Sequence, residues 1–180
     1  MTERNARHTL QVTAIEETSS TLPGELELAF RTHHALVFRT AYRITGNAAD
    51  AEDVLQVVFL RLLRRKRGTE TLDHEESYLR RAAVNASLDV IRSRQANRTV
   101  ELPPDLAHND TPELRQALRR ALAQLEPRRA EIFALRFLEG FTNPQIAKML
   151  GISHVLVAVL VHRTRQQLRK QLSSYLGDRP

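Results

Sequence analysis

Cysteine and tryptophan are absent from this 180-residue chain, and aromatic residues make up only 5% of it. Without cysteine the chain can form neither a disulfide nor a thiolate metal site. No stretch approaches the ~18 consecutive apolar residues that a membrane span needs. The N-terminus also lacks the basic start and the apolar run of a signal peptide. We therefore expect a cytoplasmic protein without membrane insertion.

Little in the sequence could support catalysis. The 7 histidines are scattered, and none has the His-Glu-x-x-His spacing or a paired partner suited to metal chemistry. No glycine-rich loop is present that could hold a phosphate. Adjacent carboxylates such as Glu75 and Glu76 point in different directions on a helix. We predict that the protein is not an enzyme and that it has no catalytic residue, metal or cofactor.

Basic charge and helical periodicity are what the chain does have. Its 27 Lys and Arg against 21 Asp and Glu give a net charge of +6, which favours a polyanionic partner such as nucleic acid. Apolar residues recur at steps of three and four, without strand alternation, and this predicts an all-α protein. We expect a flexible tail over residues 1–24, a helical domain over 25–95, a flexible linker over 96–112 and a second small helical domain over 113–176.

The helix predicted over residues 50–67 is the most unusual of the three in the first domain. Its first turn is acidic and its end is basic, as suits a helix macrodipole. Its middle, however, is apolar on most sides, whereas an ordinary surface helix has a single apolar stripe. Two explanations stay open. Either the helix is buried at the centre of a bundle, or one side packs within the domain and the other meets a partner.

The third helix, over residues 71–94, has a basic outward side. Arginines could meet phosphates, an amide could hydrogen-bond a base, and an aromatic ring could stack on an unpaired base. The candidates are Tyr78, Arg80, Arg81, Asn85, Arg92 and Arg94. The alternative is an ordinary solvated helix face.

Residues 143–165 have the pattern of a helix-turn-helix. Pro144 suits a first helical position, Gly151 suits a left-handed turn, and Ser153 suits the cap of the next helix. The second helix of such a unit enters the major groove with its N-terminal residues. The alternative is a helical hairpin that binds no DNA.

Together these stretches resemble an alternative bacterial sigma factor of the extracytoplasmic-function (ECF) type. The stretch AYRITGNAADAEDVLQVVFLRLLRR resembles sigma region 2, and YLRRAAVNASLDVIRSR resembles the adjoining stretch that opens and reads the minus-ten element. The stretch LEPRRAEIFALRFLEGFTNPQIAKMLGIS resembles sigma region 4. The blocks stand in the family's order, and the resemblance covers nearly everything from Glu25 to Leu172.

The resemblance implies a function and assigns residues to it. The protein would bind RNA polymerase core, direct it to promoter DNA and help to melt the start region, and an anti-sigma factor is a further candidate partner. Core polymerase binding is assigned to Asp50, Glu52, Asp53, Gln56 and Phe59. The candidates of the third helix would meet minus-ten DNA, with Asn85 holding a flipped-out base. Minus-thirty-five DNA is assigned to Arg136, Thr142, Asn143, His154, Arg163, Arg165 and Arg169.

Two departures from the family's pattern matter. The recognition helix is usually polar, whereas residues 155–161 read VLVAVLV here. Apolar side chains can touch thymine methyls but cannot exchange hydrogen bonds with bases, so this helix either reads bases in that way or binds protein. In addition, Val84 precedes Asn85, where arginine is common. Two other functions therefore stay open: a helix-turn-helix regulator acting without polymerase, and a protein-interaction module using the apolar last helix.

Overall fold

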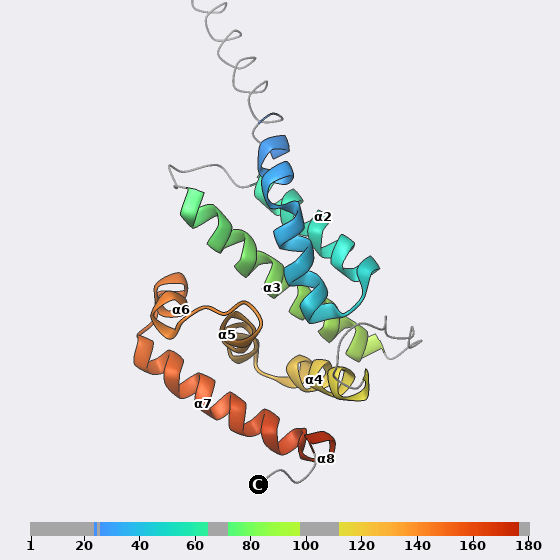
Figure 1. Cartoon of the computed structure of the whole chain (residues 1–180), viewed down its shortest axis with the longest axis vertical. Coiled ribbons are helices and arrows are strands. Elements are labelled where there is room, and N and C mark those ends of the chain that lie inside the picture. Colours follow the sequence, from blue (N-terminus) through green and yellow to red (C-terminus); the bar gives the residue numbers. More distant parts are fainter. Residues whose placement is uncertain (1–23, 25, 65–71, 98–111, 177–180) are drawn as a thin grey trace, which may run out of the picture.

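The computed structural model describes residues 24, 26–64, 72–97 and 112–176, and every element described is a helix (Figure 1). After a first helix over residues 26–45, the order is α2 (Ala48–Arg64), α3 (Leu72–Asn97), α4 (Pro112–Gln124), α5 (Pro127–Phe137), α6 (Asn143–Leu150), α7 (His154–Gln171) and α8 (Ser173–Leu176). The prediction of an all-α fold is confirmed. The predicted tail before Gly24, the basic end of the central helix over 65–67 and most of the predicted linker, 98–111, lie outside the described residues.

The first domain is a bundle of the 26–45 helix, α2 and α3. Apolar residues at helical spacing on each helix meet in its core. Almost fully buried there are Val37, Ala41, Val54, Val58, Leu79 and Ala83. Gly46, at φ 67°, makes the sharp turn between the first two helices, a conformation that glycine adopts at little cost. The side-chain oxygen of Asn47 then accepts the backbone N–H of Asp50 at 3.1 Å and caps α2.

The second domain, α4 to α8, contains the predicted helix-turn-helix. Thr142 and Gln145 form a capping box at the start of α6. Gly151, at φ 64°, ends α6, and Ser153 caps α7. The two helices are bent by 112° relative to each other, within the range of helix-turn-helix units. The largest fully buried side chains of this domain are Leu122, Ile132, Leu135, Ile146 and Val157.

Helix α3 packs on both domains. In Figure 1 it runs between the first helix and α2 on one side and α4 to α6 on the other. Val84, Leu88 and Ile91 of α3 belong to the same apolar cluster as the core of the second domain. The helical period predicts the side of α3 that faces the bundle, but not this close packing of one domain on the other. We call these three residues, with the second-domain residues they meet, the apolar seam.

Three helix ends differ from the prediction. Helix α3 continues to Asn97, so the first residues of the predicted linker are helical, and α4 already begins at Pro112. The helical period of the C-terminal stretch predicts one last helix from His154 to about Tyr175, whereas α7 ends at Gln171 and is followed by the short α8. Leu172 leaves helical geometry and is buried, which turns the chain back toward α4.

Candidate functional site

Helix α2 is packed on one side and open on the other. Its buried apolar residues are Val54, Val58 and Phe59. Its exposed side presents Val57, Leu60 and Leu63, together with the polar Asp53 and Gln56. We call these five exposed residues the α2 face. Glu52 is exposed beside them. The geometry thus supports the second explanation for this helix, in which one side remains available to a partner.

Two residues predicted for polymerase binding are buried instead. Phe59 packs in the core of the first domain, and Asp50 is 7% exposed. Arg94, from the last turn of α3, donates to Asp50 Oδ1. Burial raises the pKa of the Asp50 carboxyl, and the charge of Arg94 offsets this only in part. Asp50 and Arg94, predicted for two different surfaces, therefore bind each other inside the first domain.

Five of the six predicted minus-ten residues of α3 are partly buried, and Arg94 is exposed. Arg80, Arg81 and Asn85 all donate to carboxylates of the second domain. Of the other three candidates on this helix, Tyr78 and Arg92 are half-buried, and Arg94 is the exposed partner of Asp50 described above. The structure therefore brings this basic surface into contact with acidic groups that were not among the predicted site residues.

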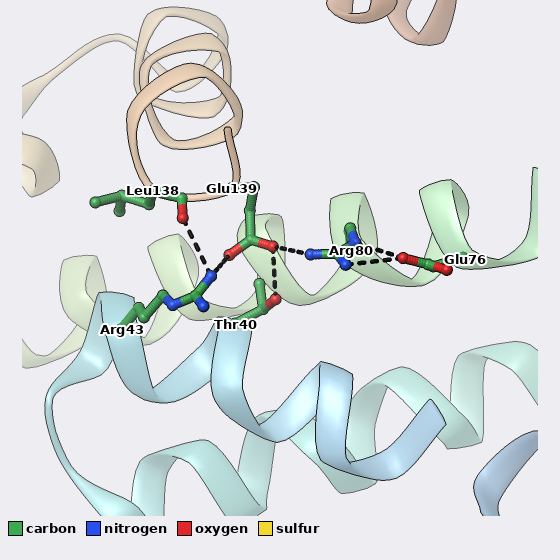
Figure 2. Close-up of polar contacts among 6 residues, drawn as sticks. All are labelled: Thr40, Arg43, Glu76, Arg80, Leu138 and Glu139. Carbon is green, nitrogen blue, oxygen red and sulfur yellow. Dashed lines mark hydrogen bonds and ion pairs between the residues drawn. The ribbon is translucent and has the colours of Figure 1, made fainter. Parts of the chain in front are cut away.

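Glu139, just after α5, is the first of these groups (Figure 2). Its side chain is 0% exposed. Glu139 Oε2 accepts from Arg80 Nη1 at 2.8 Å and from Thr40 Oγ1 at 2.9 Å. Arg43 Nη1 donates to Glu139 Oε1 and to the carbonyl of Leu138, each at 3.2 Å. A buried carboxylate is costly unless it is paired, and here the three donors all come from the first domain.

Glu131, within α5, is the second group. Its side chain is 6% exposed. Glu131 Oε1 accepts from Arg81 Nε at 2.7 Å and from Asn85 Nδ2 at 3.0 Å, while Oε2 accepts from Arg128 Nη1 at 3.1 Å. Burial by itself would raise the pKa of Glu131, but the hydrogen bonds from Arg81 and Asn85 and the nearby positive charges outweigh it and lower the pKa. The carboxylate is therefore ionised at neutral pH.

The residues predicted to meet minus-thirty-five DNA divide into two groups. Exposed on α7 are His154, Arg163, Arg165 and Arg169. The other three, Arg136, Thr142 and Asn143, lie in or near the turn that precedes α6. Thr142 forms the capping box, and Arg136 donates to the carbonyl of Phe141 at 3.2 Å. The side-chain oxygen of Asn143 is buried and has no partner among the described residues.

The apolar start of α7 is divided between core and surface. Val157 is fully buried, as expected of the side that faces the domain, whereas Val155, Leu156 and Val159 are exposed by 59%, 44% and 39%. We call these three exposed residues the α7 strip. The helical period of this stretch predicts that Val155, Ala158 and Val159 face outward; all three are exposed, and Leu156 is exposed as well.

Within the described ranges, no three His, Asp or Glu side chains are grouped so that they could hold a metal ion. Nor does the described part contain a single helix that is long and apolar enough to cross a membrane, although α6 and α7 reach the required length and apolarity when taken together.

Comparison with known proteins gives the class to which this two-domain helical architecture belongs. Sigma-70 region 2 matches residues 29–97, and Sigma-70 region 4 matches residues 115–168. The chain therefore belongs to the sigma-70 family of RNA polymerase sigma factors. Its relatives place it more narrowly in the extracytoplasmic-function (ECF) group, so the predicted family is confirmed.

One such relative is the ECF RNA polymerase sigma factor SigE of Mycolicibacterium smegmatis. It is 34% identical over 159 residues, which cover 82% of this chain and 62% of that protein. Another is the RNA polymerase sigma-E factor of Streptomyces avermitilis, 30% identical over 154 residues, covering 83% of this chain and 86% of that protein. Among solved structures, the sigma factor RpoE from Bartonella quintana, in complex with the anti-sigma factor NepR, matches with a TM-score of 0.51 at 18% identity. The match covers 86% of this chain and 99% of that one, and supports the fold.

Proposed function

We propose that this chain is an alternative sigma factor. It binds RNA polymerase core, directs it to promoter DNA and helps to melt the start region, and it catalyses no reaction itself. The observation that carries the proposal is that one chain combines regions 2 and 4 in order, with an open α2 face in the first and a helix-turn-helix in the second.

Transcription in vitro tests this function directly. Core polymerase with the purified chain is expected to initiate at discrete promoters in a library of genomic fragments, whereas core alone is not. A regulator that binds duplex DNA without polymerase would instead protect DNA in a footprint and add no specific start sites. That result would contradict the assignment as a sigma factor and favour a helix-turn-helix regulator that acts without polymerase.

The α2 face supports the polymerase contact. Interfaces concentrate their binding energy in a few central residues surrounded by groups that exclude water. Here Leu60 and Leu63 are exposed by 52% and 47%, although large apolar groups are normally withdrawn from water. The exposed Asp53 and Gln56 give the same surface directional polar contacts. An apolar ridge with polar anchors of this kind suits a helical partner surface.

Replacing Asp53 and Gln56 together by alanine is expected to weaken binding to core polymerase by about tenfold, or roughly 1–2 kcal/mol. Both side chains are exposed, so the fold should be unchanged. The matched control is Glu27→Ala, which removes an exposed acid from the first helix outside the α2 face. The measurement is a binding titration with core. If both variants bind core polymerase with equal affinity, the α2 face is not the surface that contacts it.

For DNA we assign the minus-ten element to α3, with Asn85 holding an extruded base, and the minus-thirty-five element to the helix-turn-helix. Exposed cations along α7 would anchor phosphates, which position a protein without reading sequence. The RpoE match was solved with an anti-sigma factor, and we propose a protein of that kind as a further partner of this chain.

The exposed α7 strip admits two functions for that helix, contact with thymine methyl groups or binding to protein. Val159→Ser tests them, because Val159 lies at the surface and its replacement should leave the fold intact. If the strip reads thymine methyls, the substitution should weaken binding at one promoter position by roughly 1–3 kcal/mol. Replacing thymine by uracil at the contacted position should then have the same effect.

Footprints of the unaltered chain and of Val159→Ser on a mapped promoter, with thymine or with uracil at the contacted position, measure both effects. We expect the strip to contact thymine methyl groups. Exposed cations such as Arg163 and Arg165 lie on the same helix and would anchor the neighbouring phosphates. Unchanged footprints, together with lost self-association of the Val159→Ser variant, would assign the strip to protein binding.

A further inference from the structure

We propose that the α7 strip recognises the methyl group at C5 of a pyrimidine, so that the chain binds 5-methylcytosine in its minus-thirty-five site as well as thymine. Binding to such a site then depends on whether the cytosine is methylated. The proposal rests on the assignment of the helix-turn-helix to minus-thirty-five DNA made above. It goes beyond the expected contact with thymine, because it names a modified base as a second ligand of the same strip.

The rotation of α7 about its own axis is fixed by its buried side. Val157, Thr164 and Leu168 are between 0% and 3% exposed. They recur at intervals of seven and four residues and therefore lie along one line of the helix. At about 100° per residue, Val155 and Val159 lie about 160° away from Val157. The strip is thus on the side of α7 that points away from its domain, the side with which a recognition helix enters the major groove.

The outward side of the first two turns has almost no capacity for hydrogen bonds. Residues 154–161 read HVLVAVLV, and His154 is the only polar residue among them. The side chain of Ser153, directly before them, accepts the backbone N–H of Leu156 at 3.2 Å as the helix cap. In the major groove thymine presents the O4 acceptor and cytosine the N4 donor. Valine and leucine can hydrogen-bond to neither, so the strip cannot distinguish the two bases by these groups.

The methyl group at C5 is the feature that thymine and 5-methylcytosine share. In thymine it lies in the major groove, and methylation of cytosine at C5 puts the same group at the same place on the ring. Contact with an apolar side chain removes both surfaces from water, which is favourable. Burial of one such group is worth about fourfold in affinity, equivalent to about 0.8 kcal/mol. Uracil and unmethylated cytosine lack this group, and each should bind more weakly than its methylated counterpart.

The strip is long enough to reach more than one base. Val155 and Val159 are one turn apart, which corresponds to a rise of about 6 Å along the helix. Successive base pairs are about 3.4 Å apart. Leu156 lies about 100° around the helix from Val155 and widens the strip on one side. Methyl groups on neighbouring bases can therefore be contacted by different residues of the strip.

The charges around the strip favour DNA as the partner. No Asp or Glu occurs over residues 140–177. On the same helix, beyond the strip, lie the exposed cations Arg163, Arg165, Arg169 and Lys170. Duplex DNA presents phosphates along both sides of a groove in which the C5 methyl groups lie. A protein partner would have to match these cations and the apolar strip at once, whereas DNA offers both kinds of surface in every promoter.

Base substitutions in one bound duplex test the proposal. The duplex is one that the unaltered full chain captures from a pool of genomic fragments, so the test needs no polymerase. Thymine is compared with uracil, and 5-methylcytosine with cytosine, at each pyrimidine of the footprint. Where thymine binds more tightly than uracil, we expect 5-methylcytosine to bind about fourfold more tightly than cytosine. Each comparison changes only the methyl group, so the ratio of the two affinities is insensitive to a general loss of binding.

Substitutions in the strip show whether it carries this preference. Val159→Ser should bring both ratios close to one, because a hydroxyl replaces the apolar contact. Val159→Ile keeps an apolar surface and should preserve them. The matched control is Gln166→Ser, an exposed position two turns further along the same outward side, which should leave both ratios unchanged. Circular dichroism confirms that each variant is folded.

Each outcome decides the proposal. A preference for 5-methylcytosine that Val159→Ser removes supports it. A preference that this variant retains overturns the assignment to the strip. Discrimination of thymine from uracil without discrimination of 5-methylcytosine from cytosine also overturns it, because a polar group would then be reading the base. Capture of no specific duplex overturns it as well. Initiation with core polymerase is scored separately, and a chain that fails to initiate can still prefer the methylated duplex.

Discussion

Leu88→Ala is expected to destabilise the full chain by about 2–5 kcal/mol and, at the same time, to weaken the contact between its two domains. Leu88 is 1% exposed and belongs to the apolar cluster that α3 shares with the second domain. Truncation removes buried contacts and leaves a cavity, and both effects lower the free energy of unfolding. Because the lost contacts join the two domains, the arrangement in which the domains are packed together should lose stability relative to one in which they are apart.

Leu79→Ala is the matched control. Leu79 lies on the same helix and is fully buried, but it packs in the core of the first domain alone. Urea unfolding should show a similar loss of stability for both variants. Only Leu88→Ala should lower energy transfer between dyes on cysteines introduced at the exposed positions Glu27 and Gln166, one in each domain, at temperatures where it remains folded. An equal change in energy transfer in both variants would mean that the apolar seam does not hold the two domains together.

The helices and their caps could be predicted because local interactions determine them. Gly151 and Ser153 act through backbone groups within a few residues of themselves, so the helix-turn-helix pattern is visible in the sequence and is found where predicted. Hydrogen bonds of this kind need no knowledge of the tertiary fold.

The contact between the domains could not be predicted in this way. Arg80 meets a glutamate 59 residues away and Arg81 one 50 residues away, and helical periodicity carries no information over such separations. The only local signal is that Glu131 and Glu139 are isolated acids in a basic and apolar stretch. Similarly, the apolar sequence of α2 was compatible with full or partial burial, and only the positions of the neighbouring helices distinguish the two.

The pairing of Asp50 with Arg94 illustrates the same limitation. Family resemblance assigned Asp50 to polymerase binding, and the basic outward side of the third helix assigned Arg94 to DNA. In the described structure they join the start of α2 to the end of α3. A charged residue at a matching position can thus stabilise the fold, and its burial and partners decide between the two roles.

Arg94→Ala should therefore lower the stability of the protein at neutral pH by about 1–3 kcal/mol, the cost of leaving a buried polar group without its partner. Asp50 is 7% exposed, and its second carboxylate oxygen is buried without a partner among the described residues. Burial already raises the pKa of Asp50, and the neighbouring Asp53 raises it further. Removing the cation should raise this pKa again, because nothing then offsets burial. Arg92→Ala, two residues away, breaks only a pair with the exposed Asp89 and should cost much less.

The raised pKa of Asp50 determines how the stability of the Arg94→Ala variant changes with pH. A carboxyl whose pKa is higher in the folded than in the unfolded state binds its proton more tightly when folded. Ionised Asp50 therefore opposes folding above the folded-state pKa, and this cost disappears as the pH falls through that value toward the unfolded value of 3.8. The deficit of Arg94→Ala, measured by urea unfolding, should be largest at neutral pH and shrink in acid. Asp50→Asn in the same chain should restore most of the lost stability, since it removes the uncompensated charge. A deficit that is independent of pH and unrelieved by Asp50→Asn would show that Arg94 acts through packing of its side chain rather than through its charge.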